Sequence, residues 1–267
     1  MRQRLGQHFL RDLNVVKTIL AAAELSSADA VLEIGPGKGI LTEPLAARVS
    51  HLVAVELDDG LAQRLRQQFH ARPSVQIVHA DILKIDLDAL SSATSFKVLG
   101  NLPYSITSPI FEKIMPWTAW ETGVFLIQRE VAARITAQPG SRDYGILTLA
   151  VQLFAEAETI LQVKPGAFLP PPKVSSSVIR LRRKAKPLVA QAAIPDFFDL
   201  VHGAFAHRRK TIANSLAFHV KISRSEVEKW LTDQGLRPQA RAETVPLEDY
   251  VKLSNAWSIF RREINLT

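Results

Sequence analysis

The most constraining feature of this sequence is a regular alternation of short apolar runs with helical repeats over its first two-thirds. Five runs have the length and composition of buried strands: Ala30–Ile34, His51–Glu56, Val75–His79, Phe96–Gly100 and Gly123–Gln128. Between some of these runs the leucines recur at helical spacing, which predicts helices over residues 40–49 and 61–69. Another helix is expected to start near Arg129. Strands that alternate with helices in this way predict a parallel sheet covered on both faces.

The pattern changes in the last third of the chain. Two further strands, Thr159–Lys164 and Ser177–Arg182, are joined by a proline-rich loop rather than a helix, which predicts an antiparallel pair at the sheet edge. After a linker at residues 180–187 only helical patterns follow: apolar positions from Phe197 to Leu216, a second helix over residues 225–231 and a third opened by Pro246. The sequence therefore predicts an α/β domain over residues 1–185 and a small all-helical domain over residues 186–267.

Composition excludes several classes of protein. The 267 residues are 47% hydrophobic and include no cysteine, so we expect a real core and neither disulfides nor thiolate metal sites. The seven histidines lack metal-ligand spacing, and no metal is expected. No apolar run is long enough to span a bilayer, and the N-terminal sequence has no signal-peptide core, so we expect a cytoplasmic protein without a membrane partner.

The net charge of +7 is unevenly distributed. Residues 1–179 hold 17 basic and 17 acidic side chains, whereas residues 180–267 hold 16 and 9, so the whole excess lies in the last third. A neutral large part followed by a basic last third suggests a polyanionic partner, although such a surface can also be a solubilising one.

A glycine-rich loop, Glu33-Ile34-Gly35-Pro36-Gly37-Lys38-Gly39, connects the first strand of the series to a helix. Closely spaced glycines let the backbone approach a ligand, and Glu56 at the end of the next strand can accept hydrogen bonds from a ribose. A dinucleotide fingerprint fails because Ile40 stands where its third glycine belongs, and a P-loop fails because no Gly-Lys-Ser/Thr follows. A turn without a ligand is disfavoured, since Glu33, Glu56 and Asp81 all lie at strand ends.

A second motif, Asn101-Leu102-Pro103-Tyr104, follows the fourth strand. An adenine amine is a poor nucleophile because its lone pair is delocalised into the ring. The Asn101 side-chain oxygen and a carbonyl near Leu102–Pro103 can accept its two N–H groups and aim the lone pair at a methyl carbon, while Tyr104 offers a stacking face. Taken alone, the four residues would more often form a simple turn.

Together these motifs resemble the ribosomal RNA adenine dimethyltransferases. The resemblance also covers Gln7-His8-Phe9-Leu10, His79-Ala80-Asp81-Ile82-Leu83, residues 126–135, 168–174 and 204–216, in an order that fits nearly the whole chain. It implies a Rossmann-like class I methyltransferase domain with a helical C-terminal domain, S-adenosylmethionine as cofactor, and dimethylation of two adjacent adenines near the 3′ end of 16S ribosomal RNA in the small subunit.

Carried over by position, the resemblance implies particular roles. The cofactor contacts are His8, Leu10, Gly35, Gly37, Glu56, Asp81 and Asn101, and the target base is held by Asn101, Leu102, Pro103 and Tyr104, with Phe168 as an opposing aromatic wall. The family often has Asn where this chain has His8; imidazole can still donate or accept a hydrogen bond. Phe168 could instead be core filling, but its proline-rich loop favours an exposed wall.

The cluster Arg208-Arg209-Lys210 is interpreted as a phosphate-binding site, with Arg2, Arg4 and the basic linker of residues 180–186 adding to its field. Its alternative is a solvated helix face. The expected partner is the small-subunit ribosomal RNA or its particle, and the expected state is a monomer.

Three other functions remain open at this point. A related dimethylase modifies large-subunit ribosomal RNA and typically carries Ile at the position of Leu102, and the long matched C-terminal region also favours the small-subunit enzyme. A non-catalytic RNA-binding or transcription factor could keep the fold, but the intact motifs disfavour it. A dehydrogenase is disfavoured by Ile40.

Overall fold

The computed structural model describes residues 8–90, 93, 95–186, 188–207 and 209–265. These residues pack into two compact units, one within residues 1–132 and 155–183 and the other within residues 133–154 and 184–267. Residues 133–154, which the sequence analysis assigns to the first domain, pack with the second unit. The division of roles at residue 185 stays a prediction.

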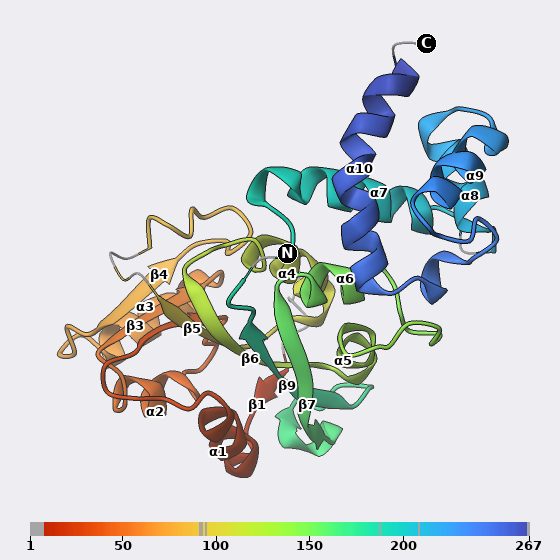
Figure 1. The fold of residues 1–267 in the computed structure, drawn as a ribbon. Coiled ribbons are helices and arrows are strands. Elements are labelled where there is room, and N and C mark those ends of the chain that lie inside the picture. Colours follow the sequence, from red (N-terminus) through yellow and green to blue (C-terminus); the bar gives the residue numbers. More distant parts are fainter. Residues whose placement is uncertain (1–7, 91–92, 94, 187, 208, 266–267) are drawn as a thin grey trace. The chain divides into compact units, whose positions relative to one another are not determined.

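The first unit is built on a seven-stranded sheet with strand order β4-β3-β2-β5-β6-β9-β7 among the described residues (Figure 1). Its strands are β2 (Ala30–Ile34), β3 (His51–Glu56), β4 (Val75–His79), β5 (Phe96–Asn101), β6 (Trp120–Gln128), β7 (Ala155–Val163) and β9 (Ser176–Arg183). Strands β4, β3, β2, β5 and β6, which are neighbours in this order, run parallel to one another. Strand β9 is antiparallel to both β6 and β7. A separate two-stranded ribbon pairs β1 (Phe9–Leu10) with β8 (Phe168–Leu169). The predicted parallel sheet with an antiparallel edge is confirmed.

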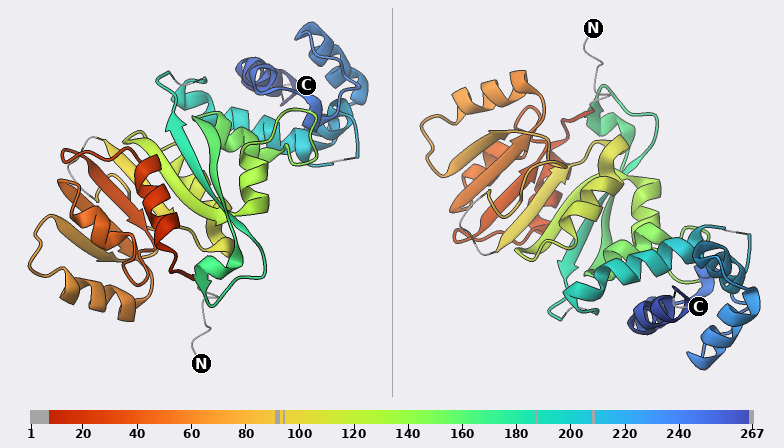
Figure 2. Two further views of the ribbon diagram at one scale, coloured as in Figure 1. Left: turned by 90° about the horizontal axis from the view of Figure 1, so that it is seen from below. Right: turned by 90° about the horizontal axis from the view of Figure 1, so that it is seen from above.

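The two faces of the sheet are covered by different helices, as the alternation along β6 shows. Val124 and Leu126 belong to a core that also contains Val16 of α1 (Leu13–Ala22) and Leu45 of α2 (Thr42–Ala46), and α1 is seen beside the strands in Figure 2. Phe125 points to the opposite face, where its ring meets Phe111 edge-on at 5.2 Å. Phe111 lies on α4 (Thr107–Ile114), so the period-two alternation of a buried strand is satisfied on both sides.

The remaining helices of the first unit are α3 (Asp59–Gln68) and the one-turn helices η1 (Tyr104–Ile106) and η2 (Pro165–Ala167), while α5 (Arg129–Ile135) spans the boundary between the units. Strand β9 extends to Arg183, which corrects the expected start of the linker at Arg180. On this strand Arg180 and Arg182 bond the carboxylates of Glu24 and Glu158. Because these two guanidinium groups are already paired, they add little to a phosphate-binding field.

The second unit is helical. It contains α6 (Ile146–Gln152), α7 (Ile194–Phe205), α8 (Ile212–Val220), α9 (Arg224–Asp233), α10 (Leu247–Asn265) and the short turns η3 (Gln191–Ala193) and η4 (Ala242–Thr244). The apolar run from Phe197 to Leu216 is two helices rather than one, since Thr211 caps α8 by accepting the Asn214 amide at its hydroxyl. None of the described helices has both the length and the apolarity to cross a membrane.

One carboxylate ties three of these helices together. Asp199 on α7 accepts hydrogen bonds from His219 Nε2 on α8 at 3.0 Å, and from Trp257 Nε1 at 2.7 Å and Arg261 at 2.9 Å on α10. Burial opposes its ionisation, but the bonds from Trp257 and His219 and the charge of Arg261 prevail and hold the pKa of Asp199 below its ordinary value. The buried stack of Trp257, Trp230 and Phe260 lies beside this cluster.

We expect Asp199→Ala to destabilise the helical unit by roughly 1–3 kcal/mol, because it leaves three donors without their acceptor. Since the folded pKa of Asp199 lies below its unfolded value, the wild-type carboxylate stabilises the fold above about pH 4, and this contribution is lost as the pH falls through the folded pKa. Urea denaturation at neutral and acidic pH measures both effects.

The matched control is Asp233→Ala, which removes an exposed carboxylate at the end of α9. It should leave the free energy of unfolding nearly unchanged. Equal effects from the two substitutions would contradict the role given to Asp199.

Candidate active site

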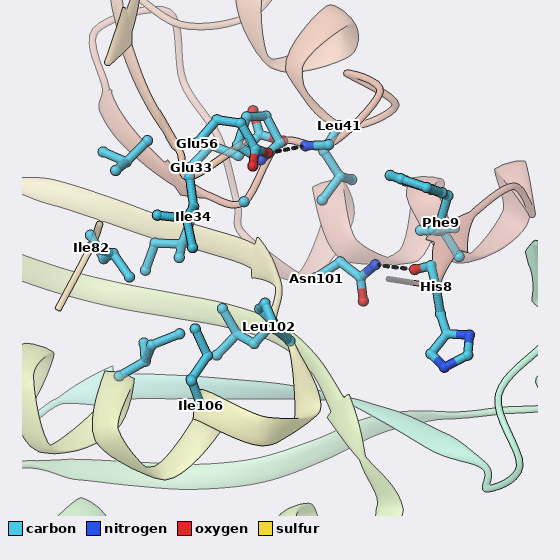
Figure 3. Close-up of a pocket in the computed structure, with 18 of the residues that line it drawn as sticks. His8, Phe9, Glu33, Ile34, Leu41, Glu56, Ile82, Asn101, Leu102 and Ile106 are labelled. Carbon is cyan, nitrogen blue, oxygen red and sulfur yellow. Dashed lines mark hydrogen bonds between the residues drawn. The ribbon is translucent and has the colours of Figure 1, made fainter. Parts of the chain in front are cut away.

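A cavity of about 200 Å³ opens at the carboxyl edge of the parallel strands (Figure 3). Segments that follow β2, β3, β4 and β5 contribute to it, as expected where parallel strands end together. Ten residues of the sequence-predicted site line it: His8, Leu10, Gly35, Gly37, Glu56, Asp81, Asn101, Leu102, Pro103 and Tyr104. The structure thus brings segments up to 96 positions apart in the chain into one pocket.

The glycine-rich loop forms one wall of the cavity, and its conformation requires glycine. Gly35, Gly37 and Gly39 adopt φ of 65°, 58° and 85°, in the left-handed region that other residues rarely occupy. A Cβ on Gly37 would also stand 3.3 Å from the Phe9 ring, and one on Gly39 would stand 2.9 Å from Leu65. The loop therefore presents bare backbone to the pocket.

Glu56 ends β3 and is only 4% exposed. Its Oε2 accepts the Gly37 amide at 3.0 Å, and its Oε1 accepts the Asp58 amide at 2.9 Å. Each oxygen keeps further acceptor capacity after one backbone bond, so a held carboxylate faces the cavity with two acceptors side by side. This is an arrangement that can bind a vicinal diol.

Asp81 follows β4 and is more accessible. Its Oδ1 accepts the Leu83 amide at 3.0 Å, and the Lys84 ammonium lies 3.8 Å from its Oδ2. The backbone bond fixes the carboxylate at the rim of the cavity, where it can accept a hydrogen bond from an amine.

Glu33 is the most buried ionisable side chain of the pocket wall, with 1% of its surface exposed, and its Oε2 has no hydrogen-bond partner among the described residues. Burial and then the negative charge of Glu56 raise the pKa of Glu33 to about 8, although the Thr42 hydroxyl lowers it in part. Near neutral pH this side chain is therefore mainly a neutral acid, which limits repulsion between neighbouring carboxyl groups.

Asn101 is the last residue of β5, and its side chain is oriented by a residue from a distant segment. Its Nδ2 donates to the His8 carbonyl at 3.1 Å, as drawn in Figure 3. Because the amide nitrogen is committed to that carbonyl, the side-chain oxygen is left as an acceptor at the cavity. This is the atom that the sequence analysis assigns to the target amine.

The next three residues are held as firmly. The Leu102 amide donates to Leu126 on β6, and the Pro103 carbonyl accepts both the Ile106 amide and the Thr107 hydroxyl. The Tyr104 hydroxyl lies 2.7 Å from Ser176 Oγ on β9. Burial raises the pKa of Tyr104, against the bond to Ser176, so the phenol stays protonated and its ring is tethered at the cavity.

His8 and Leu10 reach the site through the β1–β8 ribbon. The His8 Nδ1 donates to the Pro170 carbonyl at 2.8 Å, and its ring lies 5.8 Å from that of Tyr104. Leu10 is 5% exposed and joins the core beneath the loop. In this chain His8 therefore contributes both a main-chain acceptor for Asn101 and a ring beside the tyrosine.

Phe168 is not at the cavity, contrary to the expectation of an exposed aromatic wall. It is 1% exposed and packs in the core, opposite Leu10 in the β1–β8 ribbon. Alternation along the strand turns its neighbour Leu169 outward instead, where that side chain is 55% exposed. Phe168 is therefore a core residue in this structure, and we do not assign it a stacking role.

Most of the apolar lining of the cavity was not among the predicted site residues. This lining consists of Ile34, Ile40, Leu41, Val55, Leu57, Ile82, Ile106 and Ile110. Two signals were available: Leu57 and Ile82 each directly follow a predicted acidic residue, and Ile106 and Ile110 are four residues apart at the start of a helix.

The predicted phosphate cluster lies apart from this pocket in the chain. Arg209 and Lys210 are exposed in the segment between α7 and α8, whereas Arg208, Arg2 and Arg4 lie outside the described residues. The alternative of a solvated helix face does not hold for Arg209 and Lys210, because they precede α8. Over the part of the chain that the structure describes, no group of acidic or histidine side chains could hold a metal ion.

A mostly parallel sheet with a glycine loop and a buried carboxylate at its carboxyl edge is typical of Rossmann-like domains that bind a nucleoside cofactor, and the class I methyltransferases are one class of these. The comparison with known proteins narrows this class. The chain matches the pattern of the ribosomal RNA adenine dimethylases over residues 1–258 and belongs to that family. The resemblance found in the motifs is thereby confirmed.

Individual relatives agree with this placement. The chain is 39% identical to the ribosomal RNA small subunit methyltransferase A of Shouchella clausii, covering 96% of this chain and 89% of that protein, and 40% identical to that of Geobacillus thermodenitrificans, covering 96% and 90%. The crystal structure of the 23S rRNA methyltransferase ErmE is similar with a TM-score of 0.70, 32% identity and coverage of 94% and 99%. A dimethyladenosine transferase from Plasmodium falciparum shares the fold, with a TM-score of 0.79, 22% identity and coverage of 95% and 98%.

S-adenosylmethionine is the methyl donor in this family, and the pocket fits it. The spare acceptors of the buried Glu56 suit its ribose, the side-chain-free cradle at Gly37 admits a ligand against the backbone, and the apolar lining suits a purine.

We expect Glu33→Gln to alter how stability depends on pH. The folded chain keeps the Glu33 proton up to about pH 8, whereas the unfolded chain releases it near pH 4.5, so wild-type stability falls as the pH rises through that window. Glutamine cannot ionise, and the variant should gain relative to wild type by about 1.4 kcal/mol for each pKa unit of the shift. Urea denaturation at about pH 5 and about pH 8.5 measures this gain.

The control is Glu156→Gln, the same substitution at an exposed position of β7. It should show no such dependence. A Glu33→Gln variant whose stability differs from wild type by the same amount at both pH values would show that the buried carboxyl is not protonated.

Proposed function

We propose that this protein uses S-adenosylmethionine to dimethylate the exocyclic amines of two adjacent adenines near the 3′ end of 16S ribosomal RNA in the small subunit. The observation that carries the proposal is the orientation of Asn101, whose amide nitrogen is bound by the His8 carbonyl so that its oxygen remains an acceptor at the cavity. Catalysis is then mostly positioning.

In this proposal several residues of the pocket hold the cofactor. Glu56 would bind the ribose hydroxyls, Asp81 the adenine amine, and the backbone around Gly35 and Gly37 the part nearest the loop. When bound, the group supplies an activated methyl on a cationic sulfonium. His8 and Leu10 also line the pocket, and the pairing of β1 with β8 holds their segment in place.

The target amine requires two acceptors. Asn101 supplies one through its side-chain oxygen. Both acceptor positions of the Pro103 carbonyl are taken by Ile106 and Thr107, which favours the Leu102 carbonyl as the second. Two acceptors hold the amine pyramidal with its lone pair toward the donor, and the tethered ring of Tyr104 supports the base by stacking, which offsets part of the cost of extruding it. No general base is needed, since the methylated amine becomes strongly acidic.

The rest of the chain would hold the RNA. We assign catalysis to residues 1–185 and RNA binding to the basic residues 186–267, with Arg209 and Lys210, and Arg208 by sequence, as phosphate contacts. The small-subunit particle is the proposed partner, the cytoplasm is the compartment that this substrate implies, and a monomer is the state we propose.

The small subunit is favoured over the large one by two features. Relatives named for the small subunit share 39–40% identity with this chain, against 32% for the 23S enzyme. The second is Leu102, at a position where large-subunit enzymes typically carry Ile. This residue is 1% exposed, so its shape affects how the neighbouring acceptors are placed.

We expect labelled methyl groups to enter isolated, unmethylated small subunits and not large ones. Mass spectrometry of the labelled RNA should place dimethyladenosine at two adjacent positions near the 3′ end. Label in the large subunit alone would overturn the choice of substrate, and no label in either would overturn the activity.

We expect Asn101→Ala to lower the rate of methyl transfer by at least about 100-fold, because an acceptor aimed at the reacting amine is lost. Cofactor binding, measured by calorimetry, should fall much less, which separates the proposed enzyme from a non-catalytic RNA-binding protein. The control is Asn14→Ala, an exposed amide on α1. A normal rate for Asn101→Ala would remove the proposed mechanism.

A further inference from the structure

Phe218 is the most exposed of the large apolar side chains in the described residues. It lies near the end of α8 with 70% of its surface accessible, whereas Ile212, Ala213 and Leu216 of the same helix are fully buried. A lone exposed apolar residue needs no explanation by itself. The surroundings of Phe218 are what give it significance.

The ring of Phe218 is held in place by the segment that precedes α8. The His207 ring meets it edge-on, with centroids 4.6 Å apart and planes at 83°. The His207 carbonyl in turn accepts the Lys210 amide at 2.9 Å and the Ser215 hydroxyl at 3.4 Å. One edge of the phenylalanine is therefore fixed by a closed turn anchored on α8, while much of its surface stays open to solvent.

Exposed cations accompany this aromatic ring. Arg209 and Lys210 belong to the turn that begins at His207, and Lys221 follows α8 in a left-handed conformation, with φ of 60°. Two acidic groups on the adjoining helices are already engaged: Asp199 binds His219 and two donors of α10, and Glu226 caps α9 through Ser223. Neither of these two carboxylates is free to neutralise the three cations near Phe218.

An aromatic face flanked by cations suits an unpaired nucleic-acid base better than an apolar protein surface. Stacking on an aromatic side chain accepts any base, and the neighbouring phosphates are neutralised by the lysines and arginine. Residues 184–267 hold 13 basic and 9 acidic side chains, and this positive excess would oppose a second copy of the chain docking at the same face.

We propose that Phe218 is a stacking platform for an unpaired base of the ribosomal RNA substrate, at a contact separate from the target-adenine pocket in the other unit. His207 braces the ring, and Arg209, Lys210 and Lys221 contact the adjoining phosphates. This inference rests on the proposed function, since it takes ribosomal RNA as the ligand.

The test measures the affinity of the full chain for protein-free small-subunit ribosomal RNA over a series of salt concentrations. Phe218→Ala should weaken binding by roughly 5- to 100-fold at every salt concentration, because stacking releases no counterions. Lys210→Ala should instead reduce the slope of log affinity against log salt by about 0.7–0.9. Phe218→Trp, which keeps an aromatic face, should bind at least as tightly as the wild type.

Two further variants separate stacking from general apolarity. Phe218→Leu keeps an apolar side chain without an aromatic face and should lose affinity nearly as Phe218→Ala does. Ile259→Ala removes an exposed apolar side chain on α10, 54% accessible, and should leave RNA binding unchanged. Urea denaturation and calorimetry with the cofactor should give wild-type values for all Phe218 variants.

Three results would overturn the platform: wild-type affinity for Phe218→Ala, full affinity for Phe218→Leu, or a loss seen with assembled subunits but not with free RNA, which would indicate a protein contact. A wild-type chain that neither binds nor methylates the RNA would instead overturn the proposed function. The two failures are therefore distinguishable.

Discussion

The hydrogen bond from the Gly37 amide to the Glu56 carboxylate joins the ends of two neighbouring strands, and the site is organised around it. Parallel pairing of β2 with β3 sets Ile34 beside Val55, so the loop after one strand and the last residue of the other must meet. The bond then fixes the loop in its left-handed conformation and orients the carboxylate with acceptors to spare. A single contact thus determines both the shape of the cofactor wall and the direction of its main polar group.

The strands could be predicted closely from the sequence, and the helices less so. Ala30–Ile34, His51–Glu56 and Val75–His79 have the predicted limits, because a strand between two helical layers shows as a short apolar run bounded by turn residues. Helical periodicity reports only which face is buried. The helix predicted over residues 40–49 is therefore longer than α2, which is found as Thr42–Ala46. The break between α7 and α8 could not be detected, because the apolar positions keep their helical spacing across the turn.

The same distinction applies to the site. Side chains at the carboxyl ends of parallel strands were predictable, because sheet topology alone brings them together. What the sequence could not provide were contacts between distant segments. The bond that orients Asn101 comes from His8, 93 positions earlier, and Phe168 is turned inward by pairing with a strand near the N-terminus. A two-residue strand carries too little alternation to reveal which of Phe168 and Leu169 faces the core.

The distribution of charge follows from the two ligands that the proposal requires. A cationic sulfonium suits a pocket with acidic groups, and Glu56 and Asp81 supply them while the mainly neutral Glu33 avoids a third close negative charge. The same carboxylates would repel an RNA backbone. Phosphate contacts therefore have to come from another part of the chain, and residues 184–267, which hold 13 basic and 9 acidic side chains, supply a positive excess for them. The target base can then be positioned by two neutral groups, the Asn101 amide and the Tyr104 ring. The charges of the cofactor and of the RNA backbone do not alter these contacts.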